Sequence, residues 1–263
     1  MKPLLLVFLL AALVAAQTDT PPTSPSGIPT DVANTQKARE LINQAIAALG
    51  GSAYLNIQDV SQEGRSYSFH HGEPTSVGIL YWRFYKYPDK DRVEVTKQRD
   101  VVYIYNGNRG YEVTYKGTRA VEEKDLVNFL RRRHYALDQI LRNWINAPKT
   151  ALFYEGSAVA ADKPAEQVTV LNANNEGVTL YFDSYTHLPV KKSFSWRDPS
   201  DKERNREEEI YDNYRPVQGV MTPYRVTGFY NGDMSSQRFL NSVTYNKGLS
   251  DSMFDATVGA PPK

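Results

Sequence analysis

The sequence predicts an α+β protein in which a strongly curved antiparallel sheet forms an unclosed β-barrel, with two helices covering its concave face or mouth. Three observations lead to this fold class. About a dozen segments alternate in polarity and only two have convincing helical periodicity. The chain also has 18 tyrosines, 10 phenylalanines and 3 tryptophans, residue types that pack well in strands. Two helices cannot cover so large a sheet, so it must curl to shield its apolar face.

The first sixteen residues have the pattern of a secretory signal peptide. Lys2 provides a charged start, residues 4–14 are an unbroken apolar run, and small residues precede a cleavage point after Ala16. This run is too short to span a membrane, which takes ~20 residues. Residues 17–30 are rich in proline, serine and threonine and predict a disordered leader. We therefore expect an exported, periplasmic protein with one domain at 31–263.

Charge and cysteine content exclude several classes of function. The chain has no cysteine, which rules out disulfides, a thiolate nucleophile and a thiolate metal site. Without Lys2, 30 basic residues face 30 acidic ones, so no overall field draws nucleic acid or an anionic membrane to the protein. We expect no nucleic-acid partner and no stable membrane span.

The first element of the domain is predicted to be a helix that starts at Thr30 or Asp31, either of which can cap a helix. It should end at Gly50-Gly51, because glycine adopts the left-handed conformation common at helix ends. Its apolar side chains recur at helical spacing at Val32, Ala38, Leu41, Ile42, Ala45, Ile46 and Leu49.

A first group of strands should follow as a meander. The predicted segments are 54–63, 65–70, 76–87, 92–97, 101–105 and 111–115, with a hairpin turn at 106–110. In 76–87 the side chains alternate between two faces. One face holds Leu80, Trp82 and Phe84, and the other holds Ile79, Tyr81, Arg83, Tyr85 and Tyr87.

A second helix is predicted at about 122–145, with acidic residues in its first turn, where the helix dipole favours anions, and Pro148 after its end. Strands then resume. The predicted segments are 152–159, 166–171, 178–184, 188–196, 208–214, 221–230 and 237–245. Residues 198–207 are expected to be a charged, exposed loop.

Several segments resemble the LolA/LolB type of periplasmic lipoprotein carrier, a fold of the outer-membrane lipoprotein-sorting type. They are the aromatic strand 78–88, its return strand 92–95, the strand 101–107 ending at a glycine turn, the back strands 180–183 and 188–191, and the ending 254–262. The resemblance implies an unclosed barrel with a helical lid and an apolar cavity for acyl chains. The chain departs from it in having extra hairpins such as 188–214, and it lacks the cysteine that tethers the membrane-anchored member.

No catalytic motif is present. The sequence has no G-x-S-x-G elbow, H-E-x-x-H helix, P-loop or dinucleotide-binding glycine motif. His70 and His71 should point to opposite faces of a strand end, which makes them a poor metal chelate. The run Glu207-Glu208-Glu209 suggests either a cation site or a solvated face, and the second is usual for charge runs in loops. We expect no enzyme activity, no cofactor and no metal.

Ten residues are the candidate ligand-binding positions. The strand face that carries Trp82 is either plain core or one wall of a cavity, with helix side chains such as Phe129 forming its lid. Arg133 lies on the apolar stripe of the second helix. It is either a snorkelling or paired cation or an anchor for the head group of an anionic amphiphile. The full set is Leu80, Trp82, Phe84, Val102, Ile104, Phe129, Leu130, Arg133, Leu137 and Trp144.

These observations predict a periplasmic carrier that holds an apolar or amphiphilic ligand, either a lipid or the acyl part of a lipoprotein, in an open barrel without covalent catalysis. The alternative is a ligand-free module of the cell envelope that presents an edge strand or the 198–207 loop to a protein partner. A hydrolase is a third class, but the sequence offers no nucleophile with a matching base.

Overall fold

The computed structural model describes residues 32–75 and 77–256. The predicted signal peptide (1–16), the predicted leader (17–30) and the chain ending at 257–263 lie outside these residues. Within the described ranges, no helix has both the length and the apolar character needed to cross a bilayer.

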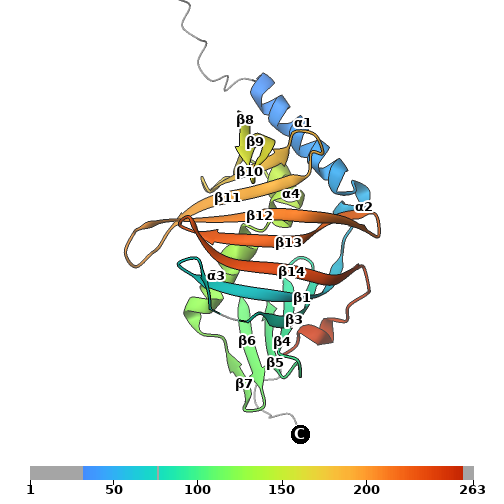
Figure 1. The fold of residues 1–263 in the computed structure, drawn as a ribbon, viewed down its shortest axis with the longest axis vertical. Coiled ribbons are helices and arrows are strands. Elements are labelled where there is room, and N and C mark those ends of the chain that lie inside the picture. Colours follow the sequence, from blue (N-terminus) through green and yellow to red (C-terminus); the bar gives the residue numbers. More distant parts are fainter. Residues whose placement is uncertain (1–31, 76, 257–263) are drawn as a thin grey trace, which may run out of the picture.

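One antiparallel sheet dominates the fold (Figure 1). Its order is β7-β6-β5-β4-β3-β1-β14-β13-β12-β11-β10-β9-β8, and β2 pairs only with β1. In the described residues β7 and β8 end this path and do not pair with each other, so the predicted unclosed antiparallel sheet is confirmed. The strands are β1 (Asp59–His70), β2 (Glu73–Pro74), β3 (Ile79–Lys86), β4 (Lys90–Val95), β5 (Val101–Asn106), β6 (Arg109–Thr114), β7 (Gly117–Ala120), β8 (Ala151–Ala160), β9 (Lys163–Leu171), β10 (Gly177–Asp183), β11 (Pro189–Arg197), β12 (Arg204–Val217), β13 (Val220–Tyr230) and β14 (Asp233–Tyr245).

Pairing of β1 with β14 joins the two halves of the chain, with Val60 opposite Tyr245. The predicted strand 54–63 is wrong at its start, because Tyr54 and Leu55 belong to the helix α2 (Ser52–Leu55). Its remainder from Asp59 joins the predicted strand 65–70 in a single strand, β1, in which a bulge at Glu63/Gly64 shifts the register. A bulge inserts one residue and bends the strand without ending it. The predicted strand 208–214 is also longer than expected, because β12 begins at Arg204.

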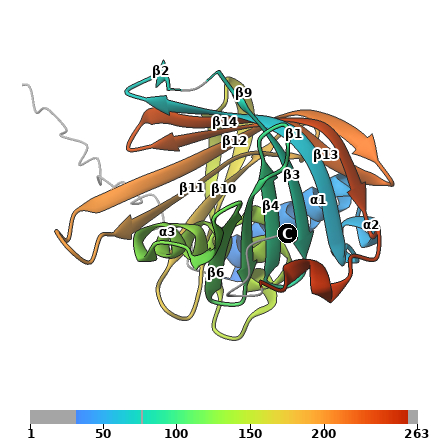
Figure 2. The ribbon, with the colours of Figure 1, turned by 90° about the horizontal axis from the view of Figure 1, so that it is seen from below.

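Four α-helices occur in the described residues: α1 (Val32–Leu49), α2 (Ser52–Leu55), α3 (Glu123–His134) and α4 (Leu137–Arg142). As predicted, α1 ends before Gly50-Gly51, and both glycines have positive φ angles. It packs on β8, β9 and β13. In Figure 2, α2 and α3 lie towards opposite ends of the long strands.

The predicted single helix at 122–145 is wrong, since the structure has α3, α4 and a 3-10 turn, η1 (Trp144–Asn146). The break falls at Tyr135 and Ala136. The Tyr135 carbonyl accepts a hydrogen bond from Lys192 Nζ at 2.7 Å, and its ring stacks on Phe194 at 4.1 Å between centroids. These contacts hold Tyr135 against the sheet and direct its carbonyl to a side chain, where the helical ladder is interrupted.

The main core lies where α1 and α4 pack on β8–β11, and it includes the fully buried Ile42, Ile140, Leu180 and Phe182. A second, smaller cluster lies on the other side of β5. It joins Val102 and Ile104 to Leu249 and to Phe254 in the C-terminal 3-10 turn η2 (Asp251–Phe254). The space between β1, β3–β5 and β12–β14 is not filled by either cluster.

Candidate functional site

The space between β1, β3–β5 and β12–β14 is a cavity of about 780 Å³. This volume lies within the ~300–1,000 Å³ typical of small-molecule sites. Alternation along the strands decides which side chains enter it. On β3 they are Ile79, Tyr81, Arg83 and Tyr85, and β4 and β5 contribute the residues that pair with them. The exposed lining residues Ser68, Ile79 and Tyr230 form its mouth, and the buried Tyr54, Tyr85, Val220 and Tyr245 form its inner end.

Three of the ten predicted ligand-binding residues line this cavity: Phe129, Arg133 and Leu137. Phe129 stacks on Tyr105 with 3.5 Å between ring centroids, so α3 covers the inner face of β5. Trp144 is buried in the main core, and Leu130 is half-buried on α3 without lining the cavity.

The other five predicted residues are on the wrong face of the sheet to line the cavity. Phe84, Val102 and Ile104 pack against the C-terminal segment around Phe254, and Leu80 and Trp82 share the Phe84 face of β3. Arg99 lies over the Trp82 ring at 4.7 Å. The prediction assigned the more apolar face to the interior, but the cavity side contains Arg83.

Arg83 is accommodated because a partner strand supplies a buried carboxylate. Its Nε and Nη2 atoms donate to Asp91 at 3.0 and 2.6 Å, and Asp91 is 1% exposed. A bidentate pair of this kind satisfies both groups. Although burial opposes the charge, Asp91 raises the pKa of Arg83, so the guanidinium remains protonated.

A second charged group crosses the interior from β11 to β14. Lys192 Nζ pairs with Glu209 at 2.9 Å, Arg238 pairs with the same carboxylate at 3.2 Å, and Tyr211 donates to it at 2.7 Å. Burial alone would raise the pKa of Glu209, but the charges of Lys192 and Arg238 lower it to about 2. Glu209 is therefore ionised at neutral pH.

Glu207 belongs to a third charged group, and its position shows that the predicted loop 198–207 is too long. It lies inside β12, is 8% exposed, and binds Arg131, Arg132 and the Trp196 indole. The turn between β11 and β12 covers only 198–203. The solvated-face interpretation of residues 207–209 is wrong, because all three carboxylates are ion-paired and mostly buried. β12 extends far enough to turn the odd-numbered Glu207 and Glu209 inward.

Arg133 differs from the other cavity-lining cations. Arg83, Arg132, Lys192 and Arg238 each have a carboxylate partner. Within residues 32–75 and 77–256, no ion pair is formed by Arg133. Its Nη1 atom donates to the Asp89 carbonyl at 3.0 Å, and its guanidinium lies 5.6 Å from the Phe129 ring.

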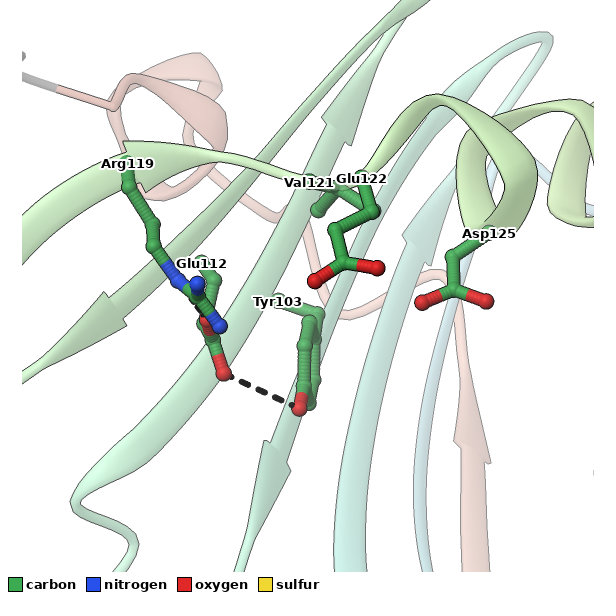
Figure 3. Close-up of a pocket in the computed structure, with 6 residues that line it drawn as sticks. All are labelled: Tyr103, Glu112, Arg119, Val121, Glu122 and Asp125. Carbon is green, nitrogen blue, oxygen red and sulfur yellow. Dashed lines mark hydrogen bonds and ion pairs between the residues drawn. The ribbon is translucent and has the colours of Figure 1, made fainter.

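A second pocket, between β5, β6, β7 and the start of α3, is small and polar (Figure 3). Its volume is about 60 Å³, enough for only a few waters. Glu112 binds Arg119 and accepts a hydrogen bond from Tyr103 at 3.2 Å, and Glu122 and Asp125 complete the walls. This pocket is too small for a hydrocarbon chain.

The structure thus defines an open antiparallel barrel with an interior cavity. No protein-family profile matches the sequence, and no curated protein does. Solved structures do match. A DUF1329 family protein from Desulfovibrio piger has a TM-score of 0.57 and 10% identity, covering 84% of this chain and 97% of that one.

Two further solved structures also match. A domain described as a lipoprotein-sorting protein of the outer membrane, from Vibrio parahaemolyticus, has a TM-score of 0.53 and 9% identity over 84% of this chain and 97% of its own. A LolA superfamily protein from Nitrosomonas europaea has a TM-score of 0.52 and 12% identity over 83% and 97%. At such identities the likeness concerns the fold, and this chain has a LolA-like fold.

Proposed function

We propose that this protein is an exported, periplasmic binding or carrier protein that holds the hydrocarbon part of an amphiphile in its cavity without covalent chemistry. The ligand is a lipid or the acyl part of a lipoprotein. The observation that carries the proposal is the 780 Å³ cavity with tyrosine, phenylalanine, valine and isoleucine in its walls. Apolar burial at ~25 cal/mol per Å² gives one long acyl chain several kcal/mol of binding free energy.

The described relatives support the lipid class of ligand, because one is a lipoprotein-sorting domain and another belongs to the LolA superfamily. The charge pattern supports an amphiphile over a plain hydrocarbon. Most charges in the cavity neutralise one another, whereas Arg133 has a backbone carbonyl and no carboxylate as its partner among the described residues. A guanidinium in this state can take up the phosphate or carboxylate of a head group.

The test is binding of a fluorescent fatty acid to the purified mature protein. We expect saturable binding, and we expect Arg133→Ala to weaken it by about 10–100-fold, as loss of a charge-assisted hydrogen bond would. The matched control is Arg65→Ala. Arg65 also donates to a backbone carbonyl, that of Gly78 at 3.2 Å, but it does not line the cavity. Equal affinities of wild type and Arg133→Ala would remove Arg133 from the site.

Native mass spectrometry of protein taken from its own cell envelope tests the proposal independently. A carrier should retain a lipid or acylated mass that urea releases. Protein that carries no such mass, and that binds no fluorescent fatty acid, would favour the alternative of a ligand-free module with a protein partner.

A further inference from the structure

The inner end of the cavity contains a buried hydroxyl group that nothing in the described residues satisfies. Tyr54 lies on α2, lines the cavity and is 8% exposed, and its Oη atom has no hydrogen-bond partner among residues 32–75 and 77–256. Buried polar atoms are nearly always paired, because an unpaired one loses its bonds to water without replacement. The Tyr54 hydroxyl therefore needs a hydrogen-bond partner from outside these residues.

Three other tyrosines of the cavity have the hydroxyl partner that Tyr54 lacks. Tyr85 donates to the Pro88 carbonyl at 2.6 Å, Tyr214 donates to the Pro189 carbonyl at 2.7 Å, and Tyr245 pairs with Thr222 at 2.7 Å. All three line the same cavity. The fold thus satisfies these three hydroxyls internally and leaves that of Tyr54 unpaired among the described residues.

A second buried donor lies close by. Arg142 Nη1 also has no partner in the described part of the chain, although Nη2 of the same guanidinium donates to the carbonyls of Leu55 and Ile57 at 3.1 and 2.9 Å. Arg142 also lies over the Tyr87 ring at 3.8 Å. Arg142 does not itself line the cavity, so Tyr54 is the donor that a hydrogen-bond-accepting group of a ligand would meet.

The charges around this end favour an acceptor without a net charge. Burial, together with the nearby negative charge of Asp138, raises the pKa of Tyr54, so its hydroxyl keeps its proton and can donate. The same carboxylate would repel an anionic group. Arg142 and Arg83 carry positive charge near these tyrosines and would repel an ammonium group.

We propose that the inner end of the cavity binds an uncharged oxygen on the ligand, a hydroxyl or carbonyl group carried by the hydrocarbon chain, through the Tyr54 hydroxyl. This rests on the proposed function and narrows it. The ligand is an oxygenated amphiphile rather than a plain saturated chain, and Tyr54 is the residue that distinguishes the two.

The experiment measures displacement of a fluorescent fatty acid by hexadecanoic acid and by its 2-, 10- and 16-hydroxy derivatives, for wild type, Tyr54→Phe and the control Tyr154→Phe. We expect Tyr54→Phe to weaken the binding of at least one hydroxy derivative by about 5–10-fold, the effect of one neutral hydrogen bond. The affinity for hexadecanoic acid should stay unchanged. Tyr154→Phe removes a hydroxyl that is paired with Glu166 and lies outside the cavity lining, so it should not alter the ratio between hydroxylated and plain acids.

The other outcomes contradict either the oxygen subsite alone or both proposals. If hexadecanoic acid binds but Tyr54→Phe alters no derivative selectively, the oxygen subsite is wrong and the proposed function stands; a water molecule alone then satisfies Tyr54. If wild type binds none of the acids, both proposals fail. Circular dichroism of each variant confirms that the compared proteins are folded.

Discussion

Replacement of Lys192 by methionine tests whether the interior charges hold the helical segment to the sheet. The Lys192 side chain is 3% exposed, and its ammonium bonds to the Tyr135 carbonyl and to Glu209. Removing one member of a buried ion pair costs about 3–5 kcal/mol, because the other charge stays buried. Arg238 and Tyr211 remain on Glu209, so we expect a loss near the lower limit, about 3 kcal/mol.

Urea unfolding followed by tryptophan fluorescence provides the assay. With a slope of about 2 kcal/mol per M, the midpoint of Lys192→Met should fall by about 1.5 M. The control is Lys90→Met, because Lys90 pairs with Asp251, which is 64% exposed and keeps Lys86 as a second partner; an exposed pair contributes less than about 1 kcal/mol. Adding Glu209→Gln to Lys192→Met should restore part of the loss. A Lys192→Met midpoint within 0.3 M of wild type would refute the reasoning.

Acid titration tests the same group with the wild-type chain. Since the pKa of Glu209 is lowered to about 2 in the folded protein, against ~4.3 in an unfolded chain, folding favours its ionised form. The resulting stability is fully present above about pH 4.3 and is lost as the pH falls towards 2. The side chain is 30% exposed, and solvent screening leaves about 2 kcal/mol. Glu209→Gln should show a smaller loss of stability between pH 5 and 2.5 than wild type.

Two further substitutions test how α1 is attached. Asn34→Ala removes two hydrogen bonds of 2.8 Å to the main chain of Tyr154 on the edge strand β8, and thermal unfolding should show a loss of about 1–2 kcal/mol that the exposed Gln36→Ala lacks. Gly50→Ala would place a Cβ 2.2 Å from the Gly219 carbonyl oxygen at a φ of +124°, so we expect a loss of about 3 kcal/mol or more. Wild-type stability in Gly50→Ala would contradict the close approach of α2 to the β12–β13 hairpin.

The sequence was sufficient for features that depend on local pattern. The helical stripe and the terminal glycines located α1, and alternating polarity located most of the strands. Because two helices could not cover so many strands, the unclosed sheet could also be predicted. The break in the second helix could not, since it depends on Lys192, which lies 57 positions from Tyr135 and bonds to its carbonyl.

Local pattern could not predict which face of β3 lines the cavity, for a similar reason. Leu80, Trp82 and Phe84 form the more apolar face, and apolar faces usually turn inward. Here Phe84 is covered from outside by the segment around Phe254, and the inward Arg83 is neutralised by Asp91 on β4. Both compensations come from other elements. The acidic residue at 91 was the signal available, because it lies opposite Tyr85 across the turn between β3 and β4.

The positions of the interior charges explain why one half of the barrel is solid and the other hollow. Where α1 and α4 meet β8–β11, the inward residues are aliphatic or aromatic and the core is packed. From β11 to β14 the inward residues include Lys192, Glu209 and Arg238. Charged groups in a dry, packed core carry a large desolvation cost, so this boundary favours space for water or for a ligand. Beyond it, tyrosines present flat apolar faces with polar tips, and such a wall suits an amphiphile better than a hydrocarbon alone.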